Sequence, residues 1–495
     1  MIAFVPARVW IFWVLFLVRG AFYSNMLPVW EGWDEYAHMA FIQHWIDYGT
    51  LPRLNDRISR EIDESMRLAP LPLELNWIGP PYLIHSDWWA LSWGERDARL
   101  RGLATLSPTL AHQDQAAVAV NGRPFVFYEA QQPPLFYWIA ALVARPAADR
   151  PLADRIHLLR WLSVFLTSLA IPFTFLAARA LFPSGSGAPE CCAALLAVAP
   201  GLAIDGARVA NDGLAIGLAA LFLWLLTREK TTWAAAGVGL GAAILAKASL
   251  LILIPILAVI WIRQPRKLVF ALATGFAIGG WWYIRNLLIG MPLTGWLESV
   301  PARTLATSAV HLLRNGGWVN GAQTIAKSLT WFGAWSFMTL HNWMYLILEA
   351  CGFGGMLAGL AARRAEVRVP AVFLGGFMIA IAAGSAAYYA VQGIPGIPGW
   401  YLWPAGGAMA ILFAAGAGRY SIVYAAMLAL TDLFGVTCRM MPYYAGLAPW
   451  NHGSVSQILP AMARLNVPMW LALGWIAATV AIPLLLLQGR AKTRM

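Results

Sequence analysis

Charged residues and cysteine are both scarce in this 495-residue sequence, which has 12% charged residues and four cysteines. A soluble protein has about 25% charged residues, so this shortage excludes an ordinary water-soluble globular domain. Cys191 and Cys192 are adjacent, while Cys351 and Cys438 stand alone. This spacing indicates neither a disulfide framework nor a cysteine-based metal site. No internal repeat and no polar linker divides the chain.

Long apolar runs are what the sequence does contain, because 60% of its residues are hydrophobic and its mean hydropathy is +0.61. About 20 apolar residues span a bilayer as a helix. Runs that reach or approach that length lie at 9–27, 157–182, 189–207, 211–227, 232–248, 249–262, 268–288, 341–361, 369–391, 400–418, 421–438 and 466–487. The first run lacks a small-residue cleavage site, so we expect it to be retained. The sequence predicts an all-α polytopic membrane protein, with residues 1–495 forming one integral membrane domain of about 12 transmembrane helices.

Basic residues predict the orientation of these helices. A net charge of +11 could indicate nucleic acid as a partner, but Lys and Arg gather in short loops beside the apolar runs. These loops include residues 228–230, 263–267, 362–368 and 489–494, together with Arg419. Short loops rich in Lys and Arg face the cytoplasm. With 12 spans all of them fall on one side, so both termini are predicted to be cytoplasmic. Membrane lipids, and no nucleic acid, are the expected neighbours.

The segment 131–146 is ambiguous, since it could be a short span or an interfacial helix. It holds only about ten apolar residues before Arg145, too few to cross a bilayer of about 30 Å. An interfacial placement also keeps every basic loop on one side. This choice leaves residues 28–156 as a large first extracytoplasmic loop. Within it, residues 56–69 predict an amphipathic helix lying on the membrane, and residues 86–106 predict another helix that begins at Ser86.

Polar residues at membrane depth map to one face of this topology. They lie at the outer ends of helices or in outer loops, and they are Asp34, Glu35, His38, Glu129, Gln131, Gln132, Asn211, Asp212, Lys247, Arg285, Asn286, His341 and Tyr401. An ionisable group in a membrane is costly unless it faces a polar cavity, so such residues are candidates for function. Their convergence predicts a single outward-facing cavity.

The residue types in this cavity suggest acid–base chemistry on a phosphate-linked substrate. A carboxylate such as Asp34 can serve as a general base, and Lys247 or Arg285 can stabilise a departing phosphate. Many of the 26 tryptophans, including Trp33, fall in outer segments, where their rings suit sugars but also the interfacial belt. Simpler interpretations stay open, since "WEGWDEYAH" could be a solvated turn and Lys247 a snorkelling anchor.

Several motifs resemble those of one family in the same order along the chain. They are "GWDEYAHMAFI", "EAQQPPLFYW", "RWLSVFLTSLAIPFTFLAARALF", "ARVANDGLAIGLAALFLWLL", "GLGAAILAKASLLILIP", "GGWWYIRNLLIGMPL" and "GWYLWPA". This series resembles the GT-C superfamily of membrane glycosyltransferases. The nearest branch is similar to protein O-mannosyltransferases and the transferase that adds aminoarabinose to lipid A. The resemblance implies a GT-C-like helical bundle with interfacial helices in the first outer loop.

The resemblance also implies a reaction. A sugar would move from a polyprenyl-phosphate donor, such as one built on undecaprenyl phosphate, to a lipid, glycan or protein acceptor. Transfer would occur by inverting displacement on the extracytoplasmic face of a bacterial inner (plasma) membrane. Asp34 would be the catalytic base, with Glu35 beside it, and Arg285 and Lys247 would hold the phosphate. The other residues expected to bind substrate are His38, Glu129, Gln131, Gln132, Asn211, Asp212, Asn286 and Tyr401. We predict no required cofactor or metal, although Asp34, Glu35 and Asp212 could host a divalent cation.

The sequence departs from the family pattern at two cationic positions. Gln132 stands where the aminoarabinose-transferase pattern has Lys before two prolines, and Trp400 stands where many bacterial relatives have Arg before Tyr401. Both departures leave fewer cations for a phosphate. A transporter or flippase for a lipid or a lipid-linked sugar is a rival interpretation, although the sequence shows neither its paired repeats nor midplane polar residues. An inactive GT-C-like scaffold is another.

Overall fold

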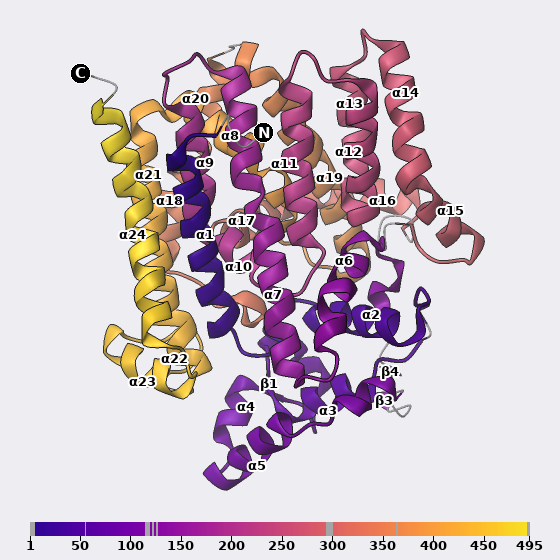
Figure 1. The fold of residues 1–495 in the computed structure, drawn as a ribbon, viewed down its shortest axis with the longest axis vertical. Helices are drawn as coiled ribbons and strands as arrows, with labels where there is room; N and C mark the ends of the chain where they lie inside the picture. The colour runs from indigo at the N-terminus through magenta and orange to yellow at the C-terminus, as the bar shows by residue number, and fades with distance from the viewer. Residues whose placement is uncertain are drawn as a thin grey trace.

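A computed structural model describes residues 5–54, 56–113, 119–120, 123–124, 127–293, 300–362 and 365–492. Within these ranges the chain is almost entirely helical (Figure 1). The described strands are two residues long, and they are β1 (Pro70–Leu71), β2 (Leu83–Ile84), β3 (Ala119–Val120) and β4 (Arg123–Pro124). β1 pairs in parallel with β2, and β3 pairs antiparallel with β4. The prediction of an all-α fold is confirmed.

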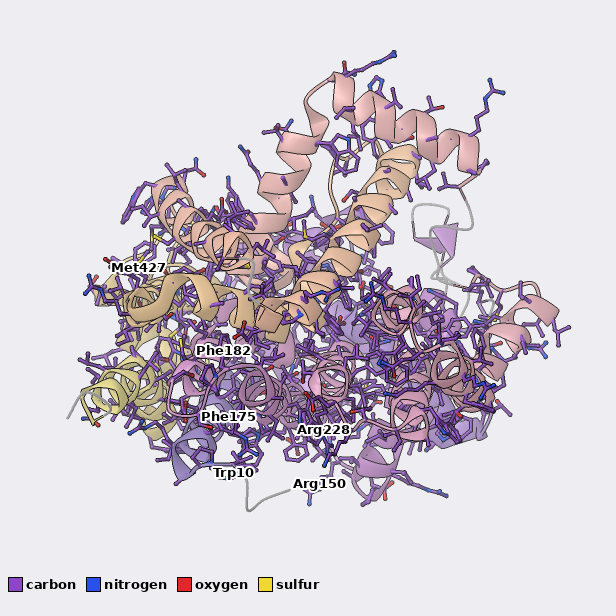
Figure 2. The ribbon with its side chains drawn as sticks, turned by 90° about the horizontal axis from the view of Figure 1, so that it is seen from above. Trp10, Arg150, Phe175, Phe182, Arg228 and Met427 are labelled. Carbon is purple, nitrogen blue, oxygen red and sulfur yellow. The ribbon has the colours of Figure 1, made fainter. Side chains whose placement is uncertain are left out.

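Most of the helices form one bundle, and seen from above most of them appear end-on (Figure 2). Their bounds are α1 (Ala7–Met26), α7 (Leu152–Ser168), α8 (Ala170–Leu181), α9 (Ala188–Val198), α10 (Pro200–Gly206), α11 (Asp212–Thr227), α12 (Trp233–Ala246), α13 (Leu253–Ile260), α14 (Pro265–Gly275), α15 (Trp281–Leu288), α16 (Ala302–Arg314), α17 (Gly317–Thr330), α18 (Asn342–Ala361), α19 (Arg368–Gln392), α20 (Gly406–Ala417), α21 (Ser421–Gly435), α22 (Met441–Tyr444), α23 (Ile458–Arg464) and α24 (Met469–Lys492). Helix α1 begins, and α24 ends, at the same end of the bundle.

The opposite end of the bundle carries a cap formed by helices from the segment 28–156 (Figure 1). Its helices are α2 (Glu35–Tyr48), α3 (Arg60–Leu68), α4 (His85–Ala90), α5 (Trp93–Ala104) and α6 (Leu135–Ala144). Helix α6 has 10 residues and is about 15 Å long at 1.5 Å per residue, half of what a span needs. The start of α1 and the end of α24 therefore lie at the end of the molecule opposite the cap.

Every apolar run identified in the sequence falls on helical structure. Seven helical stretches are long and apolar enough to cross a membrane, or eight if α9 and α10, which bend by 58° at their junction, count as one. Shorter apolar helices include α11, α12 and α13. The chain is a multi-pass membrane protein, while a total of about 12 spans stays a prediction.

One apolar stretch, Gly399–Tyr444, is 46 residues long and turns back on itself. As a straight helix it would measure about 69 Å, more than twice the hydrocarbon thickness. Gly418, at the break between α20 and α21, has a φ of 49°. The rings of Phe413 and Tyr424 on either side of the break lie 4.5 Å apart, a contact that a straight helix would not allow. The two predicted runs at 400–418 and 421–438 are therefore separate helices.

Small residues let neighbouring helices approach closely, as is usual in membrane bundles. A Cβ atom at Gly359 of α18 would collide with the carbonyl of Leu412 of α20. A Cβ atom at Gly416 would collide with the carbonyl of Gly355 in the same way. Glycine at these positions lets α18 and α20 pack backbone against backbone.

A buried ion pair also ties the bundle together. Arg19 of α1 donates to Asp432 of α21 over 2.9 Å, and both side chains are fully buried. The hydroxyl of Tyr23 and the indole nitrogen of Trp475, in α24, donate to the same carboxylate. Three helices that are distant in sequence therefore converge on one carboxylate.

Two predictions for the cap need correction. The helix predicted at 56–69 exists as α3, capped by Ser59, but Ile62 and Met66 on its apolar face are fully buried in the protein core. That face is covered by the chain itself rather than by the membrane. The helix predicted to begin at Ser86 is divided into α4 and α5. The residue that caps α5 is Ser92, whose hydroxyl accepts from the backbone N–H of Glu95 in a capping box.

Candidate active site

The acidic segment after α1 contains three carboxylates, Glu31, Asp34 and Glu35, and each faces different surroundings. Asp34 is the residue before α2 and has a left-handed backbone with a φ of 59°. With this conformation the backbone turns between Glu31 and the helix that begins at Glu35. The half-buried side chain of Asp34 is the most accessible of the three, because Glu31 and Glu35 are fully buried.

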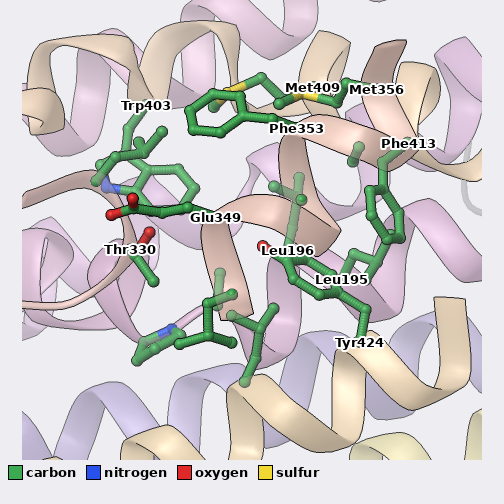
Figure 3. Close-up of a pocket in the computed structure, with 18 residues that line it drawn as sticks. Leu195, Leu196, Thr330, Glu349, Phe353, Met356, Trp403, Met409, Phe413 and Tyr424 are labelled. Atoms are coloured by element: carbon green, nitrogen blue, oxygen red, sulfur yellow. The ribbon is translucent and has the colours of Figure 1, made fainter. Parts of the chain in front are cut away.

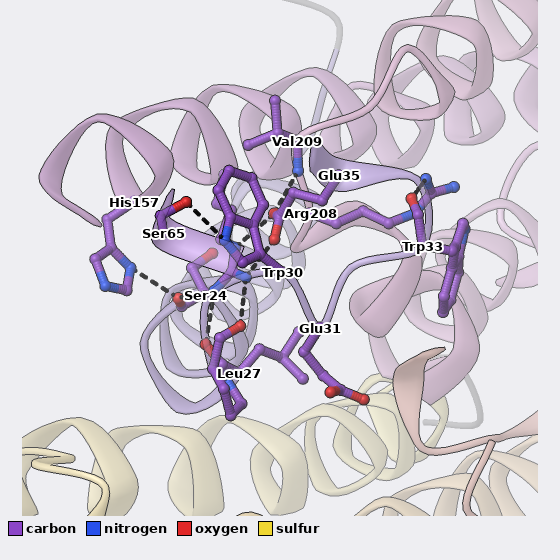
Figure 4. Close-up of polar contacts among 12 residues, drawn as sticks. Ser24, Leu27, Trp30, Glu31, Trp33, Glu35, Ser65, His157, Arg208 and Val209 are labelled. Atoms are coloured by element: carbon purple, nitrogen blue, oxygen red, sulfur yellow. Dashed lines mark hydrogen bonds and ion pairs between the residues drawn. The ribbon is translucent and has the colours of Figure 1, made fainter. Parts of the chain in front are cut away.

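Glu35 forms a two-pronged ion pair with Arg160 of α7. The guanidinium donates to its two carboxylate oxygens over 2.7 and 2.6 Å. The backbone N–H of Val209 adds a third hydrogen bond of 3.0 Å to the same carboxylate (Figure 4). Arg160 also donates to the carbonyls of Leu27 and Pro28, each over 2.7 Å. Glu35, predicted to be catalytic, therefore joins the end of α1, α7 and the loop after α10.

Glu31 also connects distant parts of the chain through its carboxylate. One of its carboxylate oxygens accepts from the Ser336 backbone N–H over 2.8 Å and from the Tyr444 hydroxyl over 2.9 Å. Its other oxygen lies 3.0 Å from Nε2 of His85 in α4. The side chains of Glu31 and His85 are fully buried. Glu31 thus fastens the cap to two later parts of the bundle, a role that the sequence did not reveal.

A buried charged network lies where α10 and α11 meet. Arg208 donates to Asp205 over 2.9 Å and to Asp212 over 2.7 Å. Lys247, which follows α12, donates to the other oxygen of Asp212 over 2.6 Å. Arg208 also donates to the Trp33 carbonyl over 3.1 Å, next to Asp34 (Figure 4). Arg208 therefore links this network of two cations and two carboxylates to the residue before Asp34.

The cap contributes Glu129, from the 3₁₀ turn Tyr128–Gln131, to the same site. Its side chain is 6% exposed, and its Oε2 atom has no hydrogen-bond partner. Burial first, and the negative charge of Asp34 second, raise the pKa of Glu129 to about 8. Glu129 is therefore mostly protonated at neutral pH.

His38, one turn after Asp34, is 3% exposed, and its Nδ1 atom lies 2.8 Å from the hydroxyl of Tyr137. Burial, followed by the charges of Arg208 and Lys247, lowers the pKa of His38 well below its usual value. The imidazole is therefore neutral at pH 7. Its ring also stacks near that of Tyr137, so His38 of α2 is held against α6.

Glu129 makes stability depend on pH, with a sign that can be worked out. Its pKa is raised in the folded state, so between the unfolded value and about 8 the folded protein holds a proton that the unfolded chain has lost. Stability attributable to this group is complete below its unfolded pKa and falls as pH rises toward about 8. We expect Glu129→Gln to flatten the fall of the unfolding midpoint between about pH 5 and about pH 8, measured in detergent. The exposed Glu229→Gln is the matched control. Identical slopes for wild type and Glu129→Gln would contradict this result.

Arg285 belongs to a second polar group, which lies outside the charged network. Its guanidinium donates to Asn286 over 3.0 Å, and it stacks 4.6 Å from the ring of Trp282. Asn286 and Trp282 in turn donate to the backbone carbonyl of Gln131, over 3.2 and 3.1 Å. None of the ion pairs in the described residues includes Arg285. Asp56 is a carboxylate near enough to act on its charge, but it forms no ion pair with Arg285.

Hydrogen bonds connect this second group to the charged network. Gln132 accepts from Asn211 over 3.2 Å, and Asn211 immediately precedes Asp212. Gln131 and Gln132 are adjacent, so the "QQPP" turn bridges the two groups. Predicted residues from both groups are therefore connected through this turn.

Tyr401 lies beside the charged network, with its ring 5.4 Å from the ammonium of Lys247. Its neighbour Trp400 stacks on Trp33 and Phe332, at centroid distances of 4.4 and 4.8 Å. These three aromatic side chains are at most 6% exposed. They pack beside the site, and they are too deeply buried to present a flat face to a sugar.

Among the polar residues predicted for the outer face, His341 has all of its described contacts outside the polar site. Its Nε2 atom lies 2.9 Å from a guanidinium nitrogen of Arg439, and its ring is 5.6 Å from Phe434. The described residues contain no group of three or more His, Cys, Asp or Glu side chains that could hold a metal ion. The carboxylates of Asp34, Glu35 and Asp212 are not gathered into one such set.

Sequence reasoning missed four residues that organise the site: Arg160, Arg208, Asp205 and Tyr137. Asp205, Arg208 and Asp212 carried a signal, because opposite charges three and four residues apart along the chain lie close enough to pair. Arg160 stands in an otherwise apolar run, which marks a charge that needs a partner. Nothing in the sequence named that partner, since Glu35 lies 125 residues away.

No protein-family model and no curated protein sequence matches this chain. Among solved structures, ArnT from Cupriavidus metallidurans bound to undecaprenyl phosphate is similar, with a TM-score of 0.52 and 14% identity, over 98% of this chain and 76% of that one. The same protein in the apo state matches with a TM-score of 0.40 and 16% identity, over 72% of this chain and 65% of that one. An Archaeoglobus fulgidus oligosaccharyltransferase matches with a TM-score of 0.35 and 12% identity, over 95% of this chain and 54% of that one. The last two scores are too low to define a fold.

The fold and the site together define a multi-pass membrane protein whose charged network meets a helical cap at one end of the bundle. Its fold is similar to that of the ArnT structure. The resemblance inferred from the motifs is therefore confirmed for the fold.

Proposed function

We propose that this protein is a glycosyltransferase that moves a sugar from a polyprenyl-phosphate donor to an acceptor hydroxyl or amine on the extracytoplasmic face of a bacterial inner membrane. The observation that carries the proposal is the accessibility of Asp34. Of three neighbouring carboxylates it alone is half-buried, beside a protonated Glu129 and a network of fixed charges. This arrangement suits a general base that takes a proton from an acceptor. The fold, shared with ArnT bound to undecaprenyl phosphate, supports the same conclusion.

The ion pair with Arg160 suggests a revised role for Glu35. Its carboxylate oxygens already accept hydrogen bonds from Arg160 and Val209, so it has little capacity to accept a proton from a substrate. We assign it to positioning, since it fixes the start of α2 and so the backbone of Asp34. Asp34 keeps the role of the base.

The distribution of charge favours Arg285 as the main ligand of the donor phosphate. In the charged network, Arg208 and Lys247 are already paired with Asp205 and Asp212. Arg285 is in none of the described ion pairs, and of the two charged groups that act on it, Arg53 has a larger effect than Asp56. Guanidinium groups bind phosphate in a charge-assisted, two-pronged geometry. Lys247 would then act mainly on Asp212, holding the network together.

Binding of undecaprenyl phosphate tests this assignment. We expect Arg285→Gln to weaken binding of the lipid to purified protein by about 10- to 100-fold, the effect of one hydrogen bond to a charged group. Arg228→Gln, at an exposed loop position after α11, is the matched control and should bind normally. Unchanged binding by Arg285→Gln, together with a loss in Lys247→Met, would place the phosphate at the charged network and contradict the assignment.

Transfer itself needs a donor that carries a sugar. Release of polyprenyl phosphate from a radiolabelled polyprenyl-phosphate sugar, in the presence of membrane extract as acceptor, measures it directly. A panel of donors would identify the sugar. If no donor in the panel were consumed by the wild-type protein while its lipid binding was intact, the proposal of an active transferase would fail.

A further inference from the structure

A cavity in the membrane-spanning bundle lies among α9, α18, α20 and α21, outside the charged network (Figure 3). Its lining is mostly apolar and includes Leu195, Phe353, Met356, Met409 and Phe413. Phe353 is 42% exposed, so the cavity opens at the side of the bundle where lipid chains would lie. A chain-like apolar ligand fits this lining better than a polar substrate does.

One end of the cavity is polar. Figure 3 shows Glu349, Thr330 and Trp403 gathered there. The Oε1 atom of Glu349 is buried and has no hydrogen-bond partner, and the same is true of the indole nitrogen of Trp403. Trp403 as a whole is 7% exposed. An acceptor and a donor thus lie unsatisfied at the head of an apolar cavity, an arrangement that is costly unless a ligand completes it.

No described cation neutralises Glu349 by direct contact. The nearest in electrostatic terms is Lys327, but its ammonium donates to Asn342 over 3.2 Å and lies 5.6 Å from the ring of Tyr345. Glu349 is two turns into α18, about 10 Å from its first residue at 1.5 Å per residue. A carboxylate at such depth marks a functional site in most membrane proteins, because burying it is unfavourable.

We propose that this cavity binds a membrane lipid whose headgroup carries a primary ammonium group, with Glu349 accepting from the ammonium and the acyl chain lying along Phe353, Met356 and Phe413. Charge complementarity selects this occupant. An anionic lipid would place its phosphate against the carboxylate, with only the Trp403 donor to offset the repulsion. A quaternary headgroup has no N–H to donate.

The cavity is distinct from the polar site but shares a structural element with it. Trp403 and Tyr401 both belong to the 3₁₀ segment Gly399–Ala405. Tyr401 lies beside Lys247, whereas Trp403 lines the lipid cavity. A lipid that hydrogen-bonds to Trp403 would therefore support the segment that also positions Tyr401.

Lipid retention tests the proposal, with phosphatidylethanolamine, phosphatidylcholine and phosphatidylglycerol as probes. In native mass spectrometry of the full-length protein, we expect phosphatidylethanolamine to be retained roughly tenfold better than the other two lipids. One hydrogen bond to a charged group accounts for a difference of about this size. Glu349→Gln should abolish this preference. Trp403→Phe, which removes the donor and keeps the ring, should reduce it. Glu229→Gln is the control for loss of an exposed carboxylate, and thermal unfolding verifies that each variant is folded.

Three results would overturn the proposal. They are equal retention of the three phospholipids by the wild-type protein, an unchanged preference in a folded Glu349→Gln variant, and displacement of phosphatidylethanolamine by undecaprenyl phosphate on equal terms. The last result would assign the cavity to the donor chain. The binding of undecaprenyl phosphate to Glu349→Gln is measured separately. This measurement distinguishes that outcome from a failure of the proposed transferase function.

Discussion

Asp34→Asn should reduce sugar transfer by about 10²- to 10⁴-fold, the usual contribution of a general base, while the protein stays folded. The amide cannot take a proton from the acceptor, so the nucleophile would have to attack without activation. Initial rates of polyprenyl phosphate release, measured for variant and wild type at saturating donor, give the effect. Binding of undecaprenyl phosphate should be nearly unchanged, because Asp34 does not hold the phosphate in this mechanism.

The fold should tolerate this substitution for a reason specific to the backbone. Asp34 has a φ of 59°, a left-handed conformation that costs most residues energy. Asn adopts it more readily than nearly any other non-glycine residue, so the turn before α2 should keep its shape. Asp97→Asn, on the cap helix α5, is a control for a carboxylate lost from the same loop. If Asp34→Asn kept more than half of the wild-type rate, Asp34 could not be the base.

The same variant separates the competing functions. A transporter or flippase would move its lipid across a vesicle membrane whether or not Asp34 can accept a proton from an acceptor. A scaffold would show no transfer in the wild type either. Loss of transfer in a folded Asp34→Asn variant that binds lipid normally would exclude both.

Arg160→Met should destabilise the protein by about 3–5 kcal/mol, the cost of leaving one buried charge without its partner. The side chains of Arg160 and Glu35 are both 0% exposed, so water cannot replace the lost ion pair. Arg160 also donates to the backbone carbonyls of Ser24, Leu27 and Pro28, and these hydrogen bonds would be lost. Denaturant unfolding in detergent, followed by tryptophan fluorescence, measures the free energy of unfolding.

The double variant Arg160→Met/Glu35→Gln provides the decisive comparison. It removes the stranded charge as well as its partner, so it should recover part of the stability lost in Arg160→Met. Arg179→Met, in the more exposed end of α8, is the control for loss of an arginine. If the double variant were as unstable as the sum of the two single variants, the ion pair would not be the source of the effect.

The sequence determined the helices of this protein and the general location of its site. Each apolar run is a local property, and a lipid-exposed backbone must satisfy its hydrogen bonds within its own helix, so the runs fold as helices in any arrangement. Polar residues within or beside such runs are equally local signals. Lys247, Asp212 and Arg285 could therefore be identified as site candidates from their positions alone.

What only the tertiary structure decided is how the three carboxylates of "WEGWDE" divide their roles. In sequence they are nearly equivalent, with the same charge within five residues. Glu31 is fixed by partners in α4 and α22, and Glu35 by Arg160, which leaves Asp34 as the half-buried one. The partners of Glu31 and Glu35 come from elsewhere in the chain, so no local pattern could assign them. The role of each acid follows from which charge reaches it when the bundle packs, and that is a property of the fold.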